Sequence, residues 1–162
     1  KALAYDPDYY HSLNNLGIAW LDLGEPKVAL YHFYEAFKAN PNGYDASYNA
    51  GIACERMGDW ANAAKCYKKA VTINPKFYNA IYNLGYVYMR NSYANEAIEC
   101  FSKIPPGHPN YADALNNLGG IAFLQGDTLK AIRYFKQTIR VAPQHTDALN
   151  NLRNLSKIGL SD

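Results

Sequence analysis

The sequence lacks any apolar run that approaches the roughly 20 residues a helix needs to cross a bilayer. It also lacks a strong charge of either sign, because 16 Lys and Arg residues against 14 Asp and Glu residues leave a formal net charge of +2. Such a balance gives no electrostatic reason to expect nucleic acid or an anionic membrane as a partner. We therefore expect a chain that neither inserts into membranes nor binds nucleic acid.

Cysteine and histidine are scarce and carry no site pattern. Cys54, Cys66 and Cys100 form no CxxC pair, so we interpret them as small buried side chains in a reducing compartment, the cytoplasm or the nucleus. A phosphate-binding loop is missing too, since Gly119 and Gly120 fall inside a predicted helix and are interpreted as packing glycines. The histidines lack a partner at metal or triad spacing and are expected on the surface: His11, His32, His108 and His145. We expect no metal, no cofactor and no enzymatic activity.

What the sequence does contain is a repeat. Five prolines follow one another at intervals of 34 residues: Pro7, Pro41, Pro75, Pro109 and Pro143. Four glycines keep the same interval: Gly17, Gly51, Gly85 and Gly119. A period of this length is typical of a solenoid, in which stacked units bury a shared core that no single unit can form alone.

Within each period, small and apolar residues fall on two helical stripes. Counting from Tyr10, positions 4, 7, 8 and 11 share one face of a helix at about 100° per residue, and positions 20, 24 and 27 share one face of a second helix. Glycine at position 8 and alanine at position 20 let another helix approach closely. Gly24, Gly58 and Gly126 predict the end of the first helix, and proline at position 32 predicts the end of the second.

This pattern resembles the tetratricopeptide repeat (TPR). Four consecutive repeats carry its glycine, alanine, aromatic and proline at positions 8, 20, 24 and 32, and the aromatic set is Phe33, Tyr67, Phe101 and Phe135. The resemblance implies an all-α fold, a TPR superhelical solenoid of antiparallel helix pairs. It also implies a protein–protein interaction scaffold, whose first helices line a concave groove for an extended peptide or a partner helix.

The register of the repeat divides the chain. We expect residues 1–9 to be the tail of a preceding repeat, residues 10–43, 44–77, 78–111 and 112–145 to be four repeats, and residues 146–162 to be a final or capping helix. The chain then resembles a piece of a longer array. In the third repeat Pro105 and Pro106 predict that the second helix stops near Lys103. The consequence is either a local change in superhelical twist, a partner-facing loop between repeats 3 and 4, or a harmless loop variation.

One face of each first helix is expected to stay open, because positions 2, 6 and 9 lie opposite the packed stripe. Position 6 is always asparagine, whose amide offers a donor and an acceptor to the backbone of an extended peptide. We call these residues the asparagine row: Asn15, Asn49, Asn83, Asn117 and Asn151. Replacing Asn83 and Asn117 by Ala is expected to weaken peptide capture and to leave the melting temperature nearly unchanged.

Two further sets of residues stand beside the asparagine row. Asp45 and Asp113 at position 2 favour ligands with Ser, Thr or basic groups, and tyrosines offer contact area with a polar tip. These tyrosines are Tyr48, Tyr82 and Tyr86. The alternative interpretation is that the whole set reflects common repeat consensus and ordinary packing.

The combined Asp and Asn positions, as in residues 112–118, also resemble the arm of O-linked N-acetylglucosamine transferases. That resemblance implies an alternative function, the substrate-recognition arm of a larger glycosyltransferase. The clamp that other TPR proteins use for chaperone tails is absent, since no basic residue stands at position 6 of the repeats. Lys65, Lys68 and Lys69 are interpreted as a solvated outer face. The oligomeric state is left open.

Overall fold

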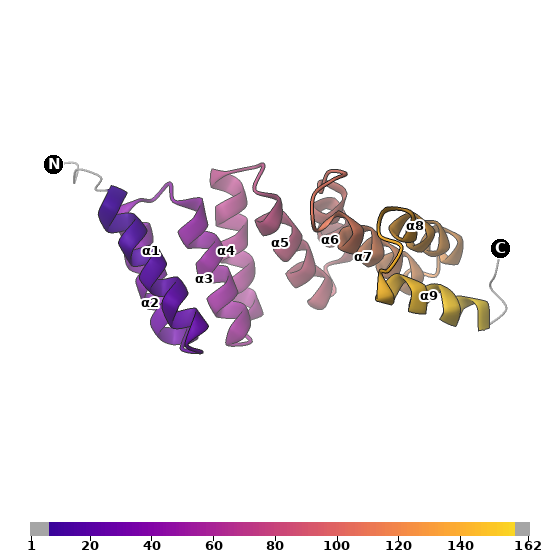
Figure 1. Ribbon diagram of the computed structural model, residues 1–162, viewed down its shortest axis with the longest axis horizontal. Coiled ribbons are helices and arrows are strands. Elements are labelled where there is room, and N and C mark those ends of the chain that lie inside the picture. The colour runs from indigo at the N-terminus through magenta and orange to yellow at the C-terminus, as the bar shows by residue number, and fades with distance from the viewer. Residues whose placement is uncertain (1–6, 158–162) are drawn as a thin grey trace. The chain divides into compact units, whose positions relative to one another are not determined.

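The computed structural model describes residues 7–157, and every element among them is an α-helix (Figure 1). The helices are α1 (Pro7–Asp22), α2 (Pro26–Ala39), α3 (Tyr44–Arg56), α4 (Trp60–Ile73), α5 (Tyr78–Arg90), α6 (Ala94–Ser102), α7 (Tyr111–Leu124), α8 (Thr128–Val141) and α9 (Thr146–Lys157). Residues 1–6 of the expected N-terminal tail, and residues 158–162 of the expected final helix, lie outside the described residues.

The chain divides into two compact units, residues 1–87 and 88–162, with the boundary inside α5. In the first unit α1 packs against α2 and α3, and α3 packs against α2 and α4. In the second unit α7 packs against α6 and α8, and α8 packs against α9. Helices α2 and α8 therefore each pack between the first helix of their own repeat and that of the next. The predicted all-α solenoid of antiparallel helix pairs is confirmed.

Inside a repeat, the glycine at position 8 lies directly under the aromatic ring at position 24. A Cβ atom added to these glycines would lie 2.5 Å from a ring carbon, whereas nonbonded carbons pack at about 3.5–4.0 Å. The pairs are Gly17 with Phe33, Gly51 with Tyr67, and Gly119 with Phe135. Only glycine lets the ring of the second helix reach the backbone of the first.

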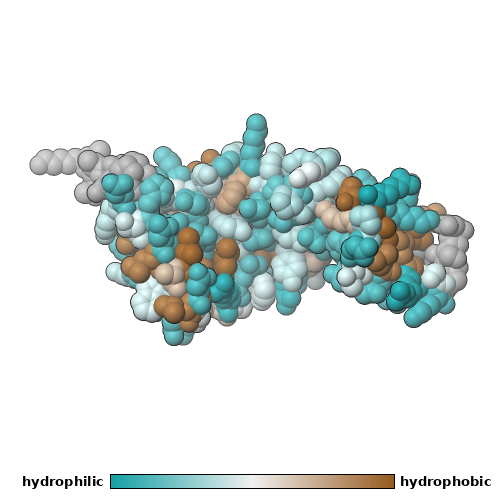
Figure 2. All heavy atoms as spheres, viewed as in Figure 1, coloured by the Kyte–Doolittle hydropathy of each residue, from teal (hydrophilic) through white to brown (hydrophobic). Residues whose placement is uncertain are grey.

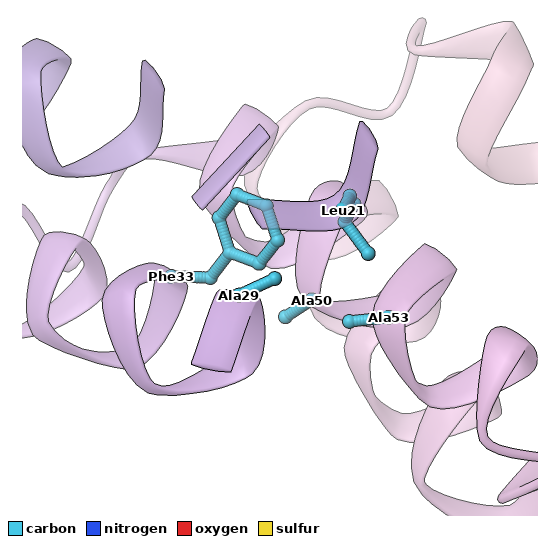
Figure 3. Close-up of a cluster of buried hydrophobic side chains, with 5 residues drawn as sticks. All are labelled: Leu21, Ala29, Phe33, Ala50 and Ala53. Carbon is cyan, nitrogen blue, oxygen red and sulfur yellow. The ribbon is translucent and has the colours of Figure 1, made fainter. Parts of the chain in front are cut away.

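The core forms where such a helix pair meets the next repeat. Figure 3 shows one cluster, in which the ring of Phe33 lies beside Ala29 of the same helix and points toward Leu21 of α1. Ala50 and Ala53 of α3 complete the cluster, and all five side chains are at most 9% exposed. Because burial of a side chain as large as Phe stabilises a fold by about 1.5–3 kcal/mol, this cluster holds the first repeat to the second.

First helices end at the residues that the sequence singles out, except in the third repeat. Gly24, Gly58 and Gly126 follow first helices with φ of 80°, 73° and 82°, the left-handed conformation that glycine adopts at low cost. In the third repeat Ser92 stands at the equivalent position with a φ of 64°. A side chain in this conformation costs roughly 1–2 kcal/mol, so the end of α5 is more strained than the other first-helix ends.

The second helix of the third repeat is short. Helix α6 has 9 residues, whereas α2, α4 and α8 have 14 each. It is capped by Lys103, near the stop that the two prolines predict. Beyond it Ile104 is 3% exposed, and a turn follows in which the His108 N–H donates to the Pro105 carbonyl at 3.2 Å. The segment after α6 is thus an ordered turn that keeps one apolar side chain in the core.

The neighbouring glycines of α7 provide a matched test of the glycine and ring contact. We expect Gly119→Ala to reduce the free energy of unfolding by about 1–3 kcal/mol, because its new methyl group collides with Phe135. We expect Gly120→Ala to raise it by about 0.5–1 kcal/mol, because alanine is the better helix former and nothing lies within 4 Å of the new Cβ. Urea unfolding followed by circular dichroism measures both changes. Equal effects of the two substitutions would contradict this packing.

Candidate peptide-binding surface

Three members of the asparagine row are tied to the repeat that precedes them. In the first unit the Asn49 Nδ2 donates to Oδ1 of Asn14, a 5% exposed side chain, at 3.0 Å. In the second unit the Asn151 Nδ2 donates to Oδ1 of Asn116 at 3.2 Å. Both bonds join position 6 of one repeat to position 5 of the repeat before. The row therefore has a structural role that the sequence analysis did not assign to it.

Asn83 makes a different connection, to two tyrosines. Its Nδ2 donates to the Tyr48 hydroxyl at 3.5 Å and to the Tyr67 hydroxyl at 3.3 Å. The Tyr67 hydroxyl in turn donates to the Glu55 carboxylate at 2.6 Å. Removing the Asn83 side chain should therefore reduce the stability of the fold. This differs from the expectation of an unchanged melting temperature, because replacement by Ala breaks both contacts.

Tyr67 and Glu55 are site residues that the sequence analysis missed. The available signal was small: position 24 is tyrosine in the second repeat and phenylalanine in the other three. The extra hydroxyl reaches Glu55 and Asn83. Burial raises the pKa of the Tyr67 phenol well above its usual value of 10.0, and the hydrogen bond to the Glu55 carboxylate adds to that rise. Burial raises the pKa of Tyr48 as well.

The two predicted aspartates also hold helices in place. Asp45 accepts a hydrogen bond from the buried Tyr10 hydroxyl, which itself accepts from the Ala46 N–H at 3.3 Å and so stabilises the start of α3. Asp113 Oδ1 lies 2.9 Å from Nε2 of His145. The other ring nitrogen of His145 accepts from the N–H of Ala148 at 3.3 Å at the start of α9.

The surface position expected for the histidines is wrong for His145. Its side chain is only 10% exposed, because it joins α7 to α9 and caps the latter. The cysteines agree with expectation in part: Cys54 and Cys100 are buried free thiols, and Cys66 is half-buried.

The remaining candidates differ in exposure. Asn15 is exposed, whereas the other four members of the asparagine row are half-buried. The three candidate tyrosines are half-buried as well. Tyr48 packs edge-on against Phe77, with ring centroids 4.9 Å apart, and contacts Tyr67 at 5.7 Å. Tyr48 is thus partly a packing residue, while its hydroxyl belongs to the network of Asn83.

The second unit carries a pocket beside the asparagine row. It has a volume of about 230 Å³ and is lined by Gly120 and Phe123 of α7, Phe135 of α8, and Asn151, Asn154 and Leu155 of α9. The interpretation of Gly120 as a packing glycine is wrong, since no atom lies within 4 Å of a Cβ built there. Position 9 is Ile18, Ile52 and Tyr86 in the other repeats, so the pocket exists because this residue has no side chain.

The described part of the chain contains no group of three His, Cys, Asp or Glu side chains arranged to hold a metal ion. None of the helices in residues 7–157 combines the length and the apolar character needed to cross a membrane. Figure 2 shows apolar side chains in separate small patches among hydrophilic ones on the face in view. The described site offers hydrogen-bonding amides and apolar contact area.

Fold and site together define a helical-repeat protein of the solenoid class. Three models described as tetratricopeptide repeat or TPR repeat match the sequence, at residues 1–44, 56–92 and 77–144. The chain belongs to the tetratricopeptide repeat family. The search of curated proteins found no significant match.

Solved structures of similar fold include two described as MamA and one as PilF. A crystal structure of MamA is 24% identical, covers 86% of this chain and 81% of its own, and has a TM-score of 0.79. MamA from residue 41 to its end, from Desulfovibrio magneticus RS-1, is 21% identical, with coverage of 97% and 89% and a TM-score of 0.84. PilF of Pseudomonas aeruginosa is 18% identical, with coverage of 92% and 71% and a TM-score of 0.76. At these identities the likeness is one of fold.

Substituting Tyr67→Phe tests the hydrogen-bond network of the first unit. At pH 7 we expect a loss of about 1 kcal/mol in the free energy of unfolding, because Glu55 and Asn83 each lose a partner. Above pH 10.0 an unfolded tyrosine loses its proton, whereas Tyr67 in the folded chain keeps it because its pKa is raised. The wild type therefore loses stability as the pH rises above 10.0. The gap between variant and wild type should therefore shrink above pH 10.0. Urea unfolding at pH 7 and above pH 10.0 measures this difference in the free energy of unfolding. An unchanged difference would contradict the raised pKa of Tyr67.

Proposed function

We propose that this chain is a protein-interaction scaffold that binds an extended peptide along its first helices. Membership of the tetratricopeptide repeat family supports binding of a protein partner in general. The specific proposal rests on one observation: an apolar pocket opens beside an amide of the asparagine row whose orientation is already held.

The amide supplies the contact to the peptide backbone. An asparagine side chain has two N–H donors and a carbonyl oxygen with two acceptor positions. The bond from Asn151 to Asn116 uses one N–H of Asn151 and leaves its carbonyl oxygen able to accept from a peptide N–H. Because that bond also restricts the rotamer of Asn151, binding loses less side-chain entropy than it would with a freely rotating amide.

The pocket supplies the preference for a particular kind of side chain. Its walls include Phe123, Phe135 and Leu155, and its volume of about 230 Å³ suits one large apolar side chain. Burying such a side chain contributes about 1.5–3 kcal/mol. We therefore propose a ligand whose backbone bonds to Asn151 while a neighbouring Leu, Ile or Phe enters the pocket. Contacts of this mode combine backbone recognition with side-chain selection.

The same surface serves the alternative function, a substrate-recognition arm within a larger glycosyltransferase. In both cases this chain binds and does not catalyse. The proposed setting is the cytoplasm or the nucleus, which the three free thiols support, since reduced cysteines are the rule in those compartments. A glycosyltransferase domain elsewhere in the parent protein would favour the alternative.

The pocket can be tested by filling it. Peptides selected from a random displayed library on the wild-type chain should be enriched in one large apolar residue. For such a peptide we expect Gly120→Ile, which restores the residue found in the first two repeats, to raise Kd about 10- to 100-fold. Fluorescence anisotropy with the labelled peptide measures this change.

Gly120→Ala is the matched control, because its small methyl group leaves most of the pocket open. We expect its Kd to stay within about threefold of the wild type, a difference below 1 kcal/mol. Thermal melts show whether both variants remain folded. Unchanged affinity in a folded Gly120→Ile variant would reject the pocket as the binding site.

A further inference from the structure

A second groove lies on the other helices of the first unit, between α2 and α4. Two adjoining cavities of about 420 and 490 Å³ share four lining residues: Leu30, Tyr34, Lys65 and Cys66. Ala46, Ser47 and Ala50 of α3 line the 420 Å³ cavity together with Phe33 of α2. We call this the outer groove. Its two sides are second helices, whereas the asparagine row belongs to first helices.

Lysines surround the outer groove. Lys27 and Lys38 lie on its α2 side, and Lys65 and Lys69 lie on its α4 side, while no carboxylate is among the described residues that line either cavity. Lys38 is bonded to Glu35 at 2.7 Å. Within residues 7–157 the other three lysines have no carboxylate within ion-pair distance. The mouth of the groove is therefore positively charged, although the whole chain carries a formal net charge of only +2.

The walls of the outer groove are apolar and partly aromatic. Tyr31 and Tyr34 of α2 are 60% and 59% exposed and line the cavities, so they offer contact area with a polar tip to a partner. Lys69 places its Nζ 3.6 Å from the centroid of the Phe37 ring, so its charge is held over the groove by a cation–π contact. Apolar walls and lysines occur together along about three turns of α2.

We propose that the outer groove binds an acidic amphipathic segment of a partner protein. Its apolar side chains would occupy the two cavities, and its carboxylates would meet the lysines on both sides. Lys65 and Lys69 are four residues apart on one helix, so they lie on the same face and suit carboxylates on successive turns of a helical ligand. Cavities of this volume with apolar walls fit aliphatic and aromatic side chains, whereas a phosphate backbone would leave them empty.

Cys66 provides a reporter inside the outer groove. It lines both cavities and is half-buried, whereas Cys54 and Cys100 are buried. A hydrogen bond from the Cys54 thiol, aided by Lys69 and Lys65, lowers the pKa of Cys66, and a lower thiol pKa raises the fraction of reactive thiolate. Iodoacetamide should therefore alkylate Cys66 first, and an occupied groove should slow that reaction.

The binding experiment uses the full chain and a designed peptide of about 15 residues, long enough for roughly four helical turns. The peptide has Leu and Phe on one helical face and Glu on the other. We expect it to bind and to slow alkylation of Cys66 as mapped by mass spectrometry. Two analogues, one with Lys in place of Glu and one with Ser in place of Leu and Phe, should bind at least about tenfold more weakly.

Charge reversal on α4 locates the site. We expect Lys65→Glu to raise Kd about tenfold. Lys68→Glu is the matched control, because Lys68 is exposed on the same helix and does not line either cavity, and its Kd should stay close to the wild-type value. Neither substitution touches Gly120 or Asn151, so failure here is separate from failure of the first-helix surface.

Several results would overturn the proposal. They are absence of peptide binding, equal binding of the lysine analogue, equal effects of Lys65→Glu and Lys68→Glu, or binding without protection of Cys66. A single-stranded RNA that binds and protects Cys66 better than the acidic peptide would overturn it in favour of a nucleic-acid surface.

Discussion

The contact between a glycine of the first helix and an aromatic ring of the second underlies the rest of this structure. With a ring carbon 2.5 Å from where a Cβ would stand, each pair has one distance and one register at which its helices fit. That fixed pair then packs against small side chains of the next repeat, as at Ala50 and Ala53 of α3. Stacking repeats in this way removes the apolar stripes from water, which is what stabilises a solenoid.

The same register determines what the two sides of a repeat present. Along the first helices it brings position 6 of one repeat to position 5 of the repeat before, so Asn49 and Asn151 stabilise the stack while they offer an oriented amide. The proposed binding surface and the repeat interface therefore share residues. On the second helices, the first unit combines cavities with lysines and exposed tyrosines. One scaffold thus carries two surfaces of different chemistry, an amide-lined one and a cationic one.

Much of the fold was predictable from the sequence because backbone constraints leave direct signals. Prolines and glycines repeat in register and mark helix ends, and small residues mark close packing. The left-handed conformation of Ser92 was not predicted, because this residue is not a glycine. The site was less predictable. Periodicity places Asn83 on a face, but its bonds to Tyr48 and Tyr67 depend on side-chain geometry. Gly119 and Gly120 are the same residue type, but their positions are about 100° apart around the helix. Gly119 therefore packs against a ring, whereas Gly120 lies beside a pocket.

A double-mutant cycle between Gly119 and Phe135 tests the central contact most directly. The free energy of unfolding is measured by urea for Gly119→Ala, for Phe135→Leu and for the double variant. The account predicts that the smaller Leu side chain makes room for the alanine methyl group, so the double variant loses less stability than the sum of the single losses, by about 1 kcal/mol. Losses that add to within about 0.3–0.5 kcal/mol would contradict it, because independent sites behave in that way.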